Sequence, residues 1–234
     1  IFWKPNGQFQ LSATLNPDFG QVESDQLVVN FGAVESFFSD KRPFFTENQS
    51  FFDVLFGSHK NSNSLIYTRR VGGPADDGNG AGDVVAAVKL NGSVGTTNYG
   101  VFAATEASDA GRDFFAARAT RDFGNQGLGV MVTQVDRPYL DRLATVYSVD
   151  HRWSPTAAWN VRSTLVASDV EQAGESVQDS GAQVRIDHES GDGWRQQLYM
   201  IHSGGGLQLN DFGYLERNNF NYIRGEVAHR ITAL

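Results

Sequence analysis

The sequence predicts an all-β fold, in which about nine or more antiparallel strands follow one another up and down a sheet. The first observation is the stretch 181–202, where the apolar residues Ala182, Val184 and Ile186 alternate with polar or charged residues. A period of two places successive side chains on opposite faces of a strand. The second observation is that similar runs recur from residue 83 onward, separated by turns rich in Gly, Asn, Asp and Pro.

Composition narrows the class of protein. A chain of 234 residues with 40% hydrophobic and 12% aromatic residues can bury a large core. It has no cysteine, which excludes disulfides and thiolate metal sites. The net charge of −8 argues against a nucleic-acid partner, and no run reaches the roughly 18–20 apolar residues of a membrane-spanning helix. The chain begins Ile1-Phe2-Trp3 without a starting Met or signal peptide, so we expect a piece of a longer chain.

The first part, residues 1–72, is predicted to hold one strand followed by a Phe-rich plug or linker segment. Residues 8–16 alternate apolar and polar side chains and predict the strand. Residues 20–56 are dense in Phe beside charged residues, which indicates a compact irregular segment rather than a flexible tether. One or two helical turns are expected over 34–39, ended by the Arg42-Pro43 pair.

The second part, residues 83–234, is predicted to supply the strands of a β-barrel. A short strand over 64–71 and a Gly-rich loop over 72–82 lead into it. Its alternating runs pair into hairpins, and one unpaired run follows them. The runs are 84–90 and 99–103 around a turn at 91–93, 115–119 and 128–132, 143–153 and 159–165, 181–189 and 194–201, and finally 219–231.

The connections between these runs alternate in length, which is typical of outer-membrane barrels. Short turns at 91–93, 122–126, 154–155 and 190–193 alternate with long polar connections at 107–112, 136–142, 169–180 and 203–218. Such an alternation puts short turns on one rim of a barrel and long loops on the other. A soluble β-sandwich does not require this rhythm.

The polar face of the predicted strands carries charges of both signs, which suits a water-filled lumen. The residues predicted to face this lumen are Arg118, Asp150, Arg152, Arg162, Arg185, Asp187, Arg224 and Glu226. A soluble barrel would fill its interior with apolar side chains instead. The apolar face would meet lipid, with an aromatic girdle near the short turns formed by Trp153, Trp159, Trp194 and Tyr199. A soluble β domain whose aromatic residues cover a core is the alternative.

Four stretches of the chain resemble an uncharacterised bacterial family. They are 13–23 (ATLNPDFGQVE), 37–45 (FFSDKRPFF), 66–72 (IYTRRVG) and 211–218 (DFGYLERN). Members of this family look like outer-membrane β-barrels that follow an N-terminal module similar to carbohydrate-binding family nine. The resemblance implies a barrel architecture and a location in the bacterial outer membrane. It carries over no catalytic residue, because the activity of the family is unsettled.

Charged and aromatic residues of the Phe-rich segment are expected to pack together. They are Asp18, Glu23, Phe37, Phe38, Lys41, Arg42, Phe44 and Phe45. Ion pairs beneath aromatic rings would fix the packing of the segment, and we favour this structural role. The alternative is a plug, in which the Phe side chains wedge against the barrel wall and Arg42 meets acids of the lumen.

The sequence contains no convincing catalytic or metal-binding pattern. Residues 76–83 place oxygen-bearing side chains between glycines, as calcium sites do, but lack a closing Glu, so a solvated loop is favoured. The histidines never reach metal-ligand spacing, and there is no Gly-x-Ser-x-Gly motif. A carboxylate pair such as Asp187 and Glu226 is already explained by strand alternation. We therefore expect no enzyme activity, no cofactor and no metal.

These observations predict a non-catalytic outer-membrane β-barrel for the passage or capture of an extracellular solute. The resemblance suggests a saccharide as that solute. The expected partners are outer-membrane lipid, the solute and other envelope proteins. Two alternatives stay open, namely a soluble β-rich carbohydrate-binding or carbohydrate-active protein, and an envelope scaffold that docks other outer-membrane proteins.

Overall fold

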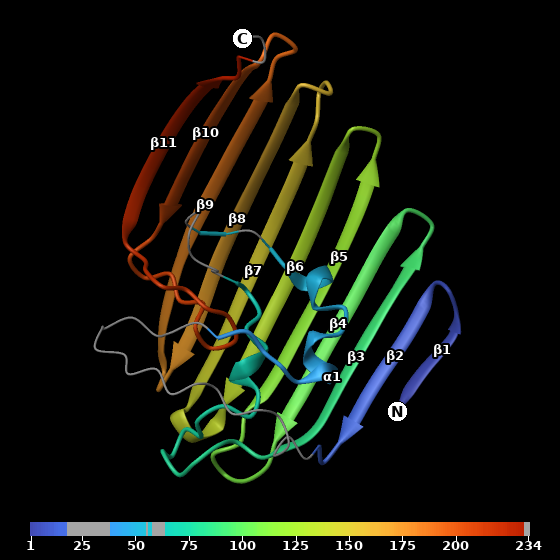
Figure 1. Ribbon diagram of the computed structural model, residues 1–234. Helices are drawn as coiled ribbons and strands as arrows, with labels where there is room; N and C mark the ends of the chain where they lie inside the picture. The colour runs from blue at the N-terminus through green and yellow to red at the C-terminus, as the bar shows by residue number, and fades with distance from the viewer. Residues whose placement is uncertain (18–37, 55, 58–63, 232–234) are drawn as a thin grey trace.

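The chain folds into one sheet whose strands follow one another in sequence order (Figure 1). The computed structural model describes residues 1–17, 38–54, 56–57 and 64–231. Within these residues, an 11-stranded antiparallel sheet runs in the order β1 to β11. The strands are β1 (Phe2–Asn6), β2 (Phe9–Leu15), β3 (Val84–Val94), β4 (Thr97–Glu106), β5 (Asp113–Phe123), β6 (Gln126–Arg137), β7 (Arg142–Trp153), β8 (Trp159–Gln172), β9 (Glu175–Glu189), β10 (Trp194–Ser203) and β11 (Phe220–His229). The predicted all-β class is confirmed.

The N-terminal hairpin belongs to the same sheet as the later strands. β2 pairs with β3 from Phe9 opposite Gly92 to Leu15 opposite Ala86, and β1 forms the edge beside β2. The chain leaves the sheet after β2 and returns to it at β3. The division predicted at residues 72–83 therefore separates the Phe-rich segment from the strands, but it does not mark the beginning of the sheet.

The two rims of the sheet differ in their connections, but two of the predicted connections, 91–93 and 169–180, were wrong. At the short-turn rim, β3 and β4 turn at Gly95, which has a φ of 60°, and not at 91–93. At the opposite, long-loop rim, the predicted loop 169–180 is strand, because β8 and β9 pair up to a tight turn at Ala173 and Gly174. Both residues of that turn have positive φ, at 51° and 81°.

The strand predicted over 64–71 was also wrong. Ser64 forms an isolated bridge with Tyr214, and Thr68–Arg70 is a 3₁₀ helix, η2. Leu65, Ile66 and Tyr67 are all buried, so neighbouring side chains do not alternate between two faces as a strand requires. The other helices are α1 (Pro43–Thr46), η1 (Gln49–Phe52) and η3 (Pro138–Leu140). None of the helices in the described residues has the length and apolar character needed to cross a membrane.

The sheet has two faces of different chemistry. We call the face that packs against residues 38–54, 56–57 and 64–83 the inner face, and these residues the inner segment. On β9 and β10, Gln183 and Tyr199 lie on the inner face, whereas Val184 and its partner Met200 lie on the outer face. Figure 1 shows the inner segment and the loop 204–219 lying across one side of the sheet, toward the long-loop rim.

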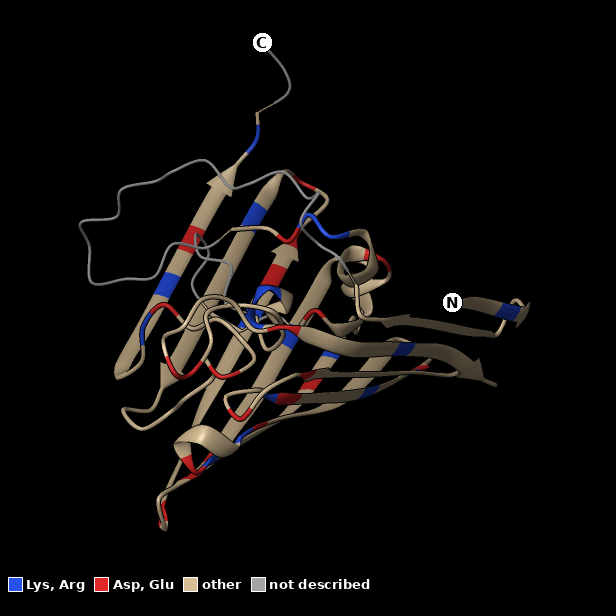
Figure 2. Cartoon of the chain, turned by 90° about the horizontal axis from the view of Figure 1, so that it is seen from below, with Lys and Arg blue, Asp and Glu red and all other residues tan. Residues whose placement is uncertain are grey.

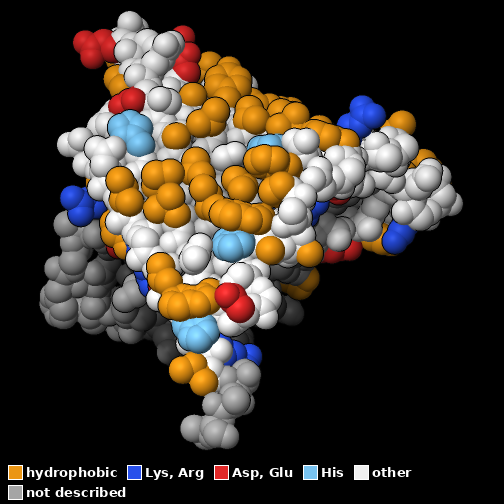
Figure 3. All heavy atoms as spheres, turned by 90° about the horizontal axis from the view of Figure 1, so that it is seen from above, with side chains coloured by type: hydrophobic (Ala, Val, Ile, Leu, Met, Phe, Trp, Pro, Cys, Tyr) orange, Lys and Arg blue, Asp and Glu red, His pale blue; other side chains and the backbone are white. Residues whose placement is uncertain are grey.

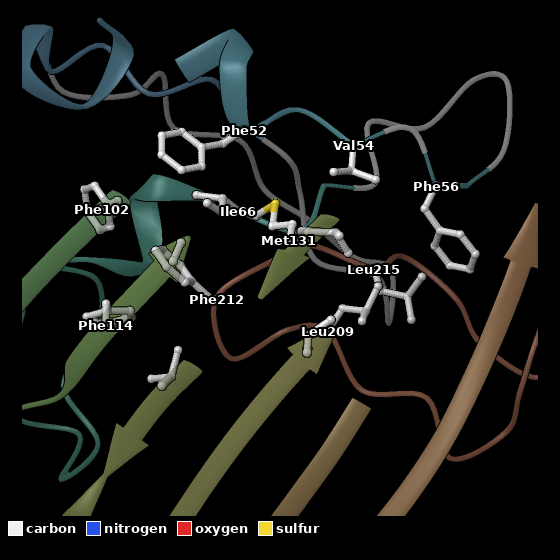
Figure 4. Close-up of a cluster of buried hydrophobic side chains, with 14 of the residues drawn as sticks. Phe52, Val54, Phe56, Ile66, Phe102, Phe114, Met131, Leu209, Phe212 and Leu215 are labelled. Carbon is white, nitrogen blue, oxygen red and sulfur yellow. The ribbon is translucent and has the colours of Figure 1, made fainter. Parts of the chain in front are cut away.

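The hydrophobic core lies between the inner face and the inner segment (Figure 4). Phe45 of α1 packs against Phe102 of β4, with ring centroids 6.1 Å apart. Phe212, from the loop 204–219, packs against both Phe102 and Phe114 of β5, at 5.7 Å and 5.2 Å. Phe45, Phe114 and Phe212 are each at most 2% exposed. This packing holds the inner segment on the sheet.

Two glycines of the inner face provide room for phenyl rings of the inner segment. A Cβ atom at Gly100 of β4 would lie 2.7 Å from the ring of Phe51, and one at Gly181 of β9 would lie 2.5 Å from Phe56. Both distances are too short for a carbon contact. The inner face is therefore shaped to accept these rings at two places on the sheet.

We expect Gly100→Val to loosen the inner segment, because the new side chain would overlap the Phe51 ring. Overpacking of this kind typically costs about 1–3 kcal/mol. The labelling rate of a thiol at the fully buried position of Val71, in the otherwise cysteine-free chain, would measure the opening. Gly225→Val is the matched control, since a Cβ at Gly225 meets nothing within 4 Å. Equal rates in the two variants would contradict the account.

Candidate functional site

The inner face is divided into an apolar half and a charged half. Toward the long-loop rim it presents buried apolar residues such as Phe102, Phe114 and Val135, which the inner segment and the loop 204–219 cover. Toward the short-turn rim it presents charges. Figure 2 shows that both basic and acidic residues occur along the strands of the sheet. The charged half is the candidate functional site.

All residues predicted to face a lumen lie on the inner face. The pairing registers place Arg152 opposite Arg162, Arg162 opposite Arg185, Arg185 opposite Tyr199 and Tyr199 opposite Arg224. Arg118 lies on the same face, because it contacts Asp150 across the sheet. The remaining acids, Asp187 and Glu226, lie two residues from Arg185 and Arg224 along their strands. Whether this face borders a lumen stays a prediction.

These charges form ion pairs along the inner face. Arg118 lies 2.8 Å from Asp150, and Asp187 accepts hydrogen bonds from Arg162 at 3.2 Å and from Arg185 at 2.9 Å. Further toward the edges of the charged half, Arg224 lies 2.7 Å from Glu226 and Arg152 lies 2.8 Å from Asp122. The pairs are more exposed toward the short-turn rim, where the side chain of Arg152 is 58% exposed.

A second set of charges, which the sequence did not reveal, joins the inner segment to the sheet at the long-loop rim. We call it the ion-pair chain, and its members are Glu106, Arg112, Asp76, Arg137, Asp211 and Arg142. Arg137 donates hydrogen bonds to Asp76 at 2.6 Å and to Asp211 at 2.9 Å. Asp76 belongs to the inner segment and Asp211 to the loop 204–219. Arg137, at the end of β6, thereby holds both the inner segment and the loop 204–219, which together cover the apolar half.

The ion-pair chain is largely buried. The side chains of Glu106, Asp76 and Asp211 are 0%, 2% and 7% exposed. Arg112 donates to Glu106 at 2.7 Å and 2.9 Å, and Glu106 also accepts the backbone N–H of Gly72 at 2.7 Å. Each of these buried carboxylates therefore has several hydrogen-bond partners.

Burial of Asp211 works to raise its pKa, but the hydrogen bonds and charges of Arg142 and Arg137 outweigh this effect. The pKa of Asp211 is therefore lower than that of a free Asp. Asp40 of the inner segment follows the same pattern. Its burial is outweighed by hydrogen bonds from Arg42 and Thr68, so the pKa of Asp40 is also lowered. Both groups are ionised at neutral pH.

Within the described residues, Arg42 and Phe45 of the Phe-rich segment lie in contact. Arg42 donates to Asp40 at 2.7 Å and to the backbone carbonyls of Val71 and Thr68, each at 2.8 Å. Its guanidinium lies 4.1 Å from the ring centroid of Phe45. Arg42 thus contacts its own segment, whereas Asp150 and Asp187 of the sheet bind other arginines.

The other residues predicted for this packing are found in contact, are exposed, or lie outside the described residues. Phe44 lies edge-on to Phe45 at 5.2 Å, and Phe38 accepts the guanidinium of Arg69 over its ring at 5.6 Å. Lys41 is exposed. The predicted positions Asp18, Glu23 and Phe37, and most of the helical turns expected over 34–39, lie outside the described residues.

A buried lysine provides a further link that the sequence did not suggest. Lys89 of β3 lies on the inner face, is only 4% exposed and donates to the backbone carbonyl of Glu47. Its ammonium lies 5.1 Å from the ring centroid of Phe44. An isolated buried charge is costly, so this carbonyl and ring are needed partners. They position the end of α1 on the sheet.

The first residue of the loop 76–83, Asp76, is buried and paired, unlike a residue of a solvated loop. Asp76 is held in the ion-pair chain, whereas Asp77 forms a local turn by accepting the N–H of Asn79 at 2.9 Å. In the described residues, no group of His, Asp or Glu is arranged to hold a metal ion. A hollow of about 540 Å³ beside η3 is lined by Asp136, Asp141 and Glu171 among other residues, but these acids do not converge.

The outer face carries aromatic residues at the ends of strands along the short-turn rim. Phe123 and Trp153 end β5 and β7, and Trp159 and Trp194 begin β8 and β10. All four are exposed by 39–44%. Trp159 stacks on His188 at 4.1 Å, and Trp194 stacks on His229 at 4.5 Å.

Tyr199 was wrongly grouped with these aromatics. It lies on the inner face, is 6% exposed and donates to the backbone carbonyl of Gly57. Five positions separate it from Trp194 along β10, so the two side chains lie on opposite faces. Its position fixes the inner segment at the boundary between the apolar and charged halves.

Seen from above, hydrophobic side chains gather into a broad band with histidines among them, while charged side chains lie mostly at its margins (Figure 3). The exposed apolar and aromatic residues of the outer face include Val88, Phe115, Phe123, Leu128, Val130, Tyr147, Val149, Trp153, Trp159, Leu165, Trp194, Ile223 and Val227. Soluble monomers seldom expose so continuous an apolar surface.

Comparison with known proteins adds a partial match. Residues 3–95 match a family described as a domain of unknown function (DUF5916). The match runs from β1 to the end of β3 and includes the inner segment. No curated protein matches the chain. The two faces of the sheet are therefore the basis for a functional proposal.

Replacement of Asp211 by Asn should release the inner segment, because Arg137 and Arg142 would lose their shared carboxylate. Breaking a buried ion pair from one side typically costs about 3–5 kcal/mol, and the partial exposure of both arginines places the expected effect at the low end. The thiol-labelling rate at position 71 would report the loss. Asp192→Asn, in an exposed turn at the opposite rim, is the control and should leave the rate unchanged.

The same contact should weaken in acid. The pKa of Asp211 is lower in the folded protein than in the unfolded chain, so its stabilising contribution is complete above about pH 4. The contribution is lost as the pH falls through the lowered folded value. The difference in labelling rate between the wild type and Asp211→Asn should therefore shrink below about pH 4. A difference that persists there would contradict this assignment.

Proposed function

We propose that this chain forms part of the wall of a bacterial outer-membrane β-barrel for the passage or capture of an extracellular solute. The observation that carries the proposal is that apolar and charged residues are distributed in the reverse of the way expected for a soluble β-barrel, whose interior is apolar. The outer face exposes a band of apolar side chains, while charged residues such as Arg162 and Asp187 occupy the inner face. In a membrane barrel the outer surface contacts hydrocarbon and the interior contacts water, so both faces find a suitable solvent.

The aromatic residues at the short-turn rim support this orientation. Trp and Tyr accumulate where hydrocarbon meets lipid headgroups. Trp153, Trp159 and Trp194 lie on the outer face, each at the first or last position of a strand, where such an aromatic belt would form. In the proposed barrel, the short-turn rim would lie toward the periplasm and the long-loop rim toward the exterior.

The edges of the sheet also favour a larger assembly. Among the described residues, β1 and β11 each pair with a single strand. An unpaired strand edge in a bilayer leaves backbone groups without hydrogen bonds, which costs several kcal/mol for each group. We propose that further strands, pairing with these two edges, complete the wall.

The inner segment would act as a plug within the barrel. It covers the apolar half of the inner face, and buried contacts at Phe45, Lys89 and Asp76 hold it there. Beside it, Arg152 and Arg162 of the charged half are 58% and 39% exposed. A solute entering from the long-loop rim would therefore meet the inner segment before it reached the charged half, which favours capture or gated passage over a permanently open pore.

Two other functions remain candidates. A soluble β-rich carbohydrate-binding or carbohydrate-active protein would bury the outer face under a second protein layer. An envelope scaffold would use the same face, or the open edges, to dock other outer-membrane proteins. The resemblance to barrels that follow a sugar-binding module makes a saccharide the first solute to test, and it favours the barrel over both alternatives.

Spin labels on the β9–β10 hairpin would distinguish these functions, since the chain has no native cysteine. In detergent or lipid, labels at Val184→Cys and Ile186→Cys should be accessible to oxygen, which concentrates in hydrocarbon. Labels at Arg185→Cys and Asp187→Cys should be accessible to a water-soluble nickel chelate instead. The alternating positions are controls for one another. If neither reagent reaches labels at 184 and 186, these residues lie in a closed protein core, and the proposed barrel is contradicted.

Deletion of residues 30–57 tests the plug. The inner face would lose the contacts of Phe45 and Phe52, so the single-channel conductance of the full-length protein in planar bilayers should rise severalfold. Heat-modifiable migration in detergent would verify that the barrel still forms. A deletion variant that folds but conducts like the wild type would rule out the plug while leaving the barrel in place.

A further inference from the structure

Three arginines lie side by side across the charged half of the inner face. Arg152 of β7 is directly opposite Arg162 of β8, which is directly opposite Arg185 of β9. We call these three residues the arginine row. Side chains directly opposite on neighbouring strands have Cβ atoms about 4.5–5.5 Å apart, and like charges at this spacing destabilise a sheet. The arrangement is therefore unfavourable for folding alone.

Nearby acids neutralise the row only in part. Asp187 is shared between Arg162 and Arg185, and Arg152 pairs with Asp122, whose side chain is 67% exposed. Three guanidinium groups thus face two carboxylates. The Nε atom of Arg162 is buried and has no hydrogen-bond partner among the described residues. The row keeps both surplus positive charge and an unused donor.

Another arginine of the charged half, Arg118, also has donors without hydrogen-bond partners in the described residues. Arg118 is 7% exposed at its side chain and contacts Asp150 through Nη2. Its Nε and Nη1 atoms are buried without hydrogen-bond partners in the described part of the chain. Buried guanidinium donors are normally satisfied, because an unsatisfied one carries a desolvation penalty. These Arg118 atoms are too buried for a solute to reach, so the site is assigned to the more exposed arginine row.

We propose that the arginine row binds a small solute through a carboxylate or phosphate group. The planar guanidinium fork matches these oxyanions with two parallel hydrogen bonds, which a lysine cannot provide. The side chains of Arg152 and Arg162 are 58% and 39% exposed, so an oxyanion can reach them without displacing the inner segment. This inference names the solute class for the barrel and rests on the function proposed above.

Binding to the purified full-length protein in detergent would test the site at low ionic strength. Glucuronate and inorganic phosphate are the probes, and glucose is the neutral counterpart of glucuronate. We expect glucuronate to bind at least tenfold more tightly than glucose, and Arg162→Gln to weaken it about tenfold. Arg162→Lys keeps the charge but removes the fork, so an intermediate loss is expected. Binding of phosphate alone would assign the site to phosphate and not to sugar acids.

Arg121→Gln is the matched control. Arg121 is also an exposed strand arginine, but it lies on the outer face, three positions from Arg118 along β5. The Arg121→Gln variant should bind glucuronate as tightly as the wild type. Equal binding of glucuronate by Arg162→Gln and the wild type, with the variant folded by heat-modifiable migration, would overturn the site, as would equal binding of glucose and glucuronate together with no binding of phosphate.

Planar-bilayer recordings separate this inference from the proposed function. In a potassium chloride gradient, the wild type should pass chloride in preference to potassium, and Arg152→Gln and Arg162→Gln should reduce that permeability ratio at least twofold. No conductance from any variant, together with intact glucuronate binding, would reject passage but retain the site. Conductance with an unchanged ratio and no oxyanion binding would reject the site but retain the barrel.

Discussion

The structure depends on one constraint, which is that a β-strand directs successive side chains to opposite faces. Along the 11-stranded sheet, this constraint separates an exposed apolar surface from a surface of packed and charged residues. Val184 and Arg185 are covalent neighbours, yet their side chains meet different surroundings. Since the period is two, a slip of one residue in any pairing would reverse both faces of that strand. The register is therefore fixed by chemistry on both sides of the sheet.

The inner face in turn determines what can cover it. Its apolar half would expose Phe102 and Phe114 if nothing packed there, and the inner segment and the loop 204–219 supply the missing layer. Hydrophobic contact alone is not directional. The position of this layer is set by polar contacts with defined geometry, of which the pairing of Arg137 with Asp76 and Asp211 is the clearest. Packing supplies the attraction, and the ion-pair chain fixes the orientation.

Sequence alternation was enough to predict the all-β class, most strands and the shared face of the eight charges predicted to face a lumen, because these are local properties of a strand. It failed where the chain is not alternating or where partners are distant. The polar stretch 169–180 resembles a loop by composition, yet positive φ at Ala173 and Gly174 lets it continue as a hairpin. Arg142 and Asp211 are 69 residues apart, and no local pattern relates them. Tyr199 was grouped with the aromatic residues of the outer face because it is close in sequence to Trp194. Five positions along a strand, however, place the two side chains on opposite faces.

The arginine row and the inner segment meet at Tyr199. This residue lies directly opposite Arg185 on the neighbouring strand, and its hydroxyl donates to the carbonyl of Gly57. In the proposed barrel, a solute held by the row would thus lie next to the boundary of the inner segment. In that barrel, the inner segment would lie between the row and the long-loop rim, whereas Arg152 and Arg162 are exposed toward the short-turn rim. The two rims would then give unequal access to the proposed site, as capture followed by controlled release requires.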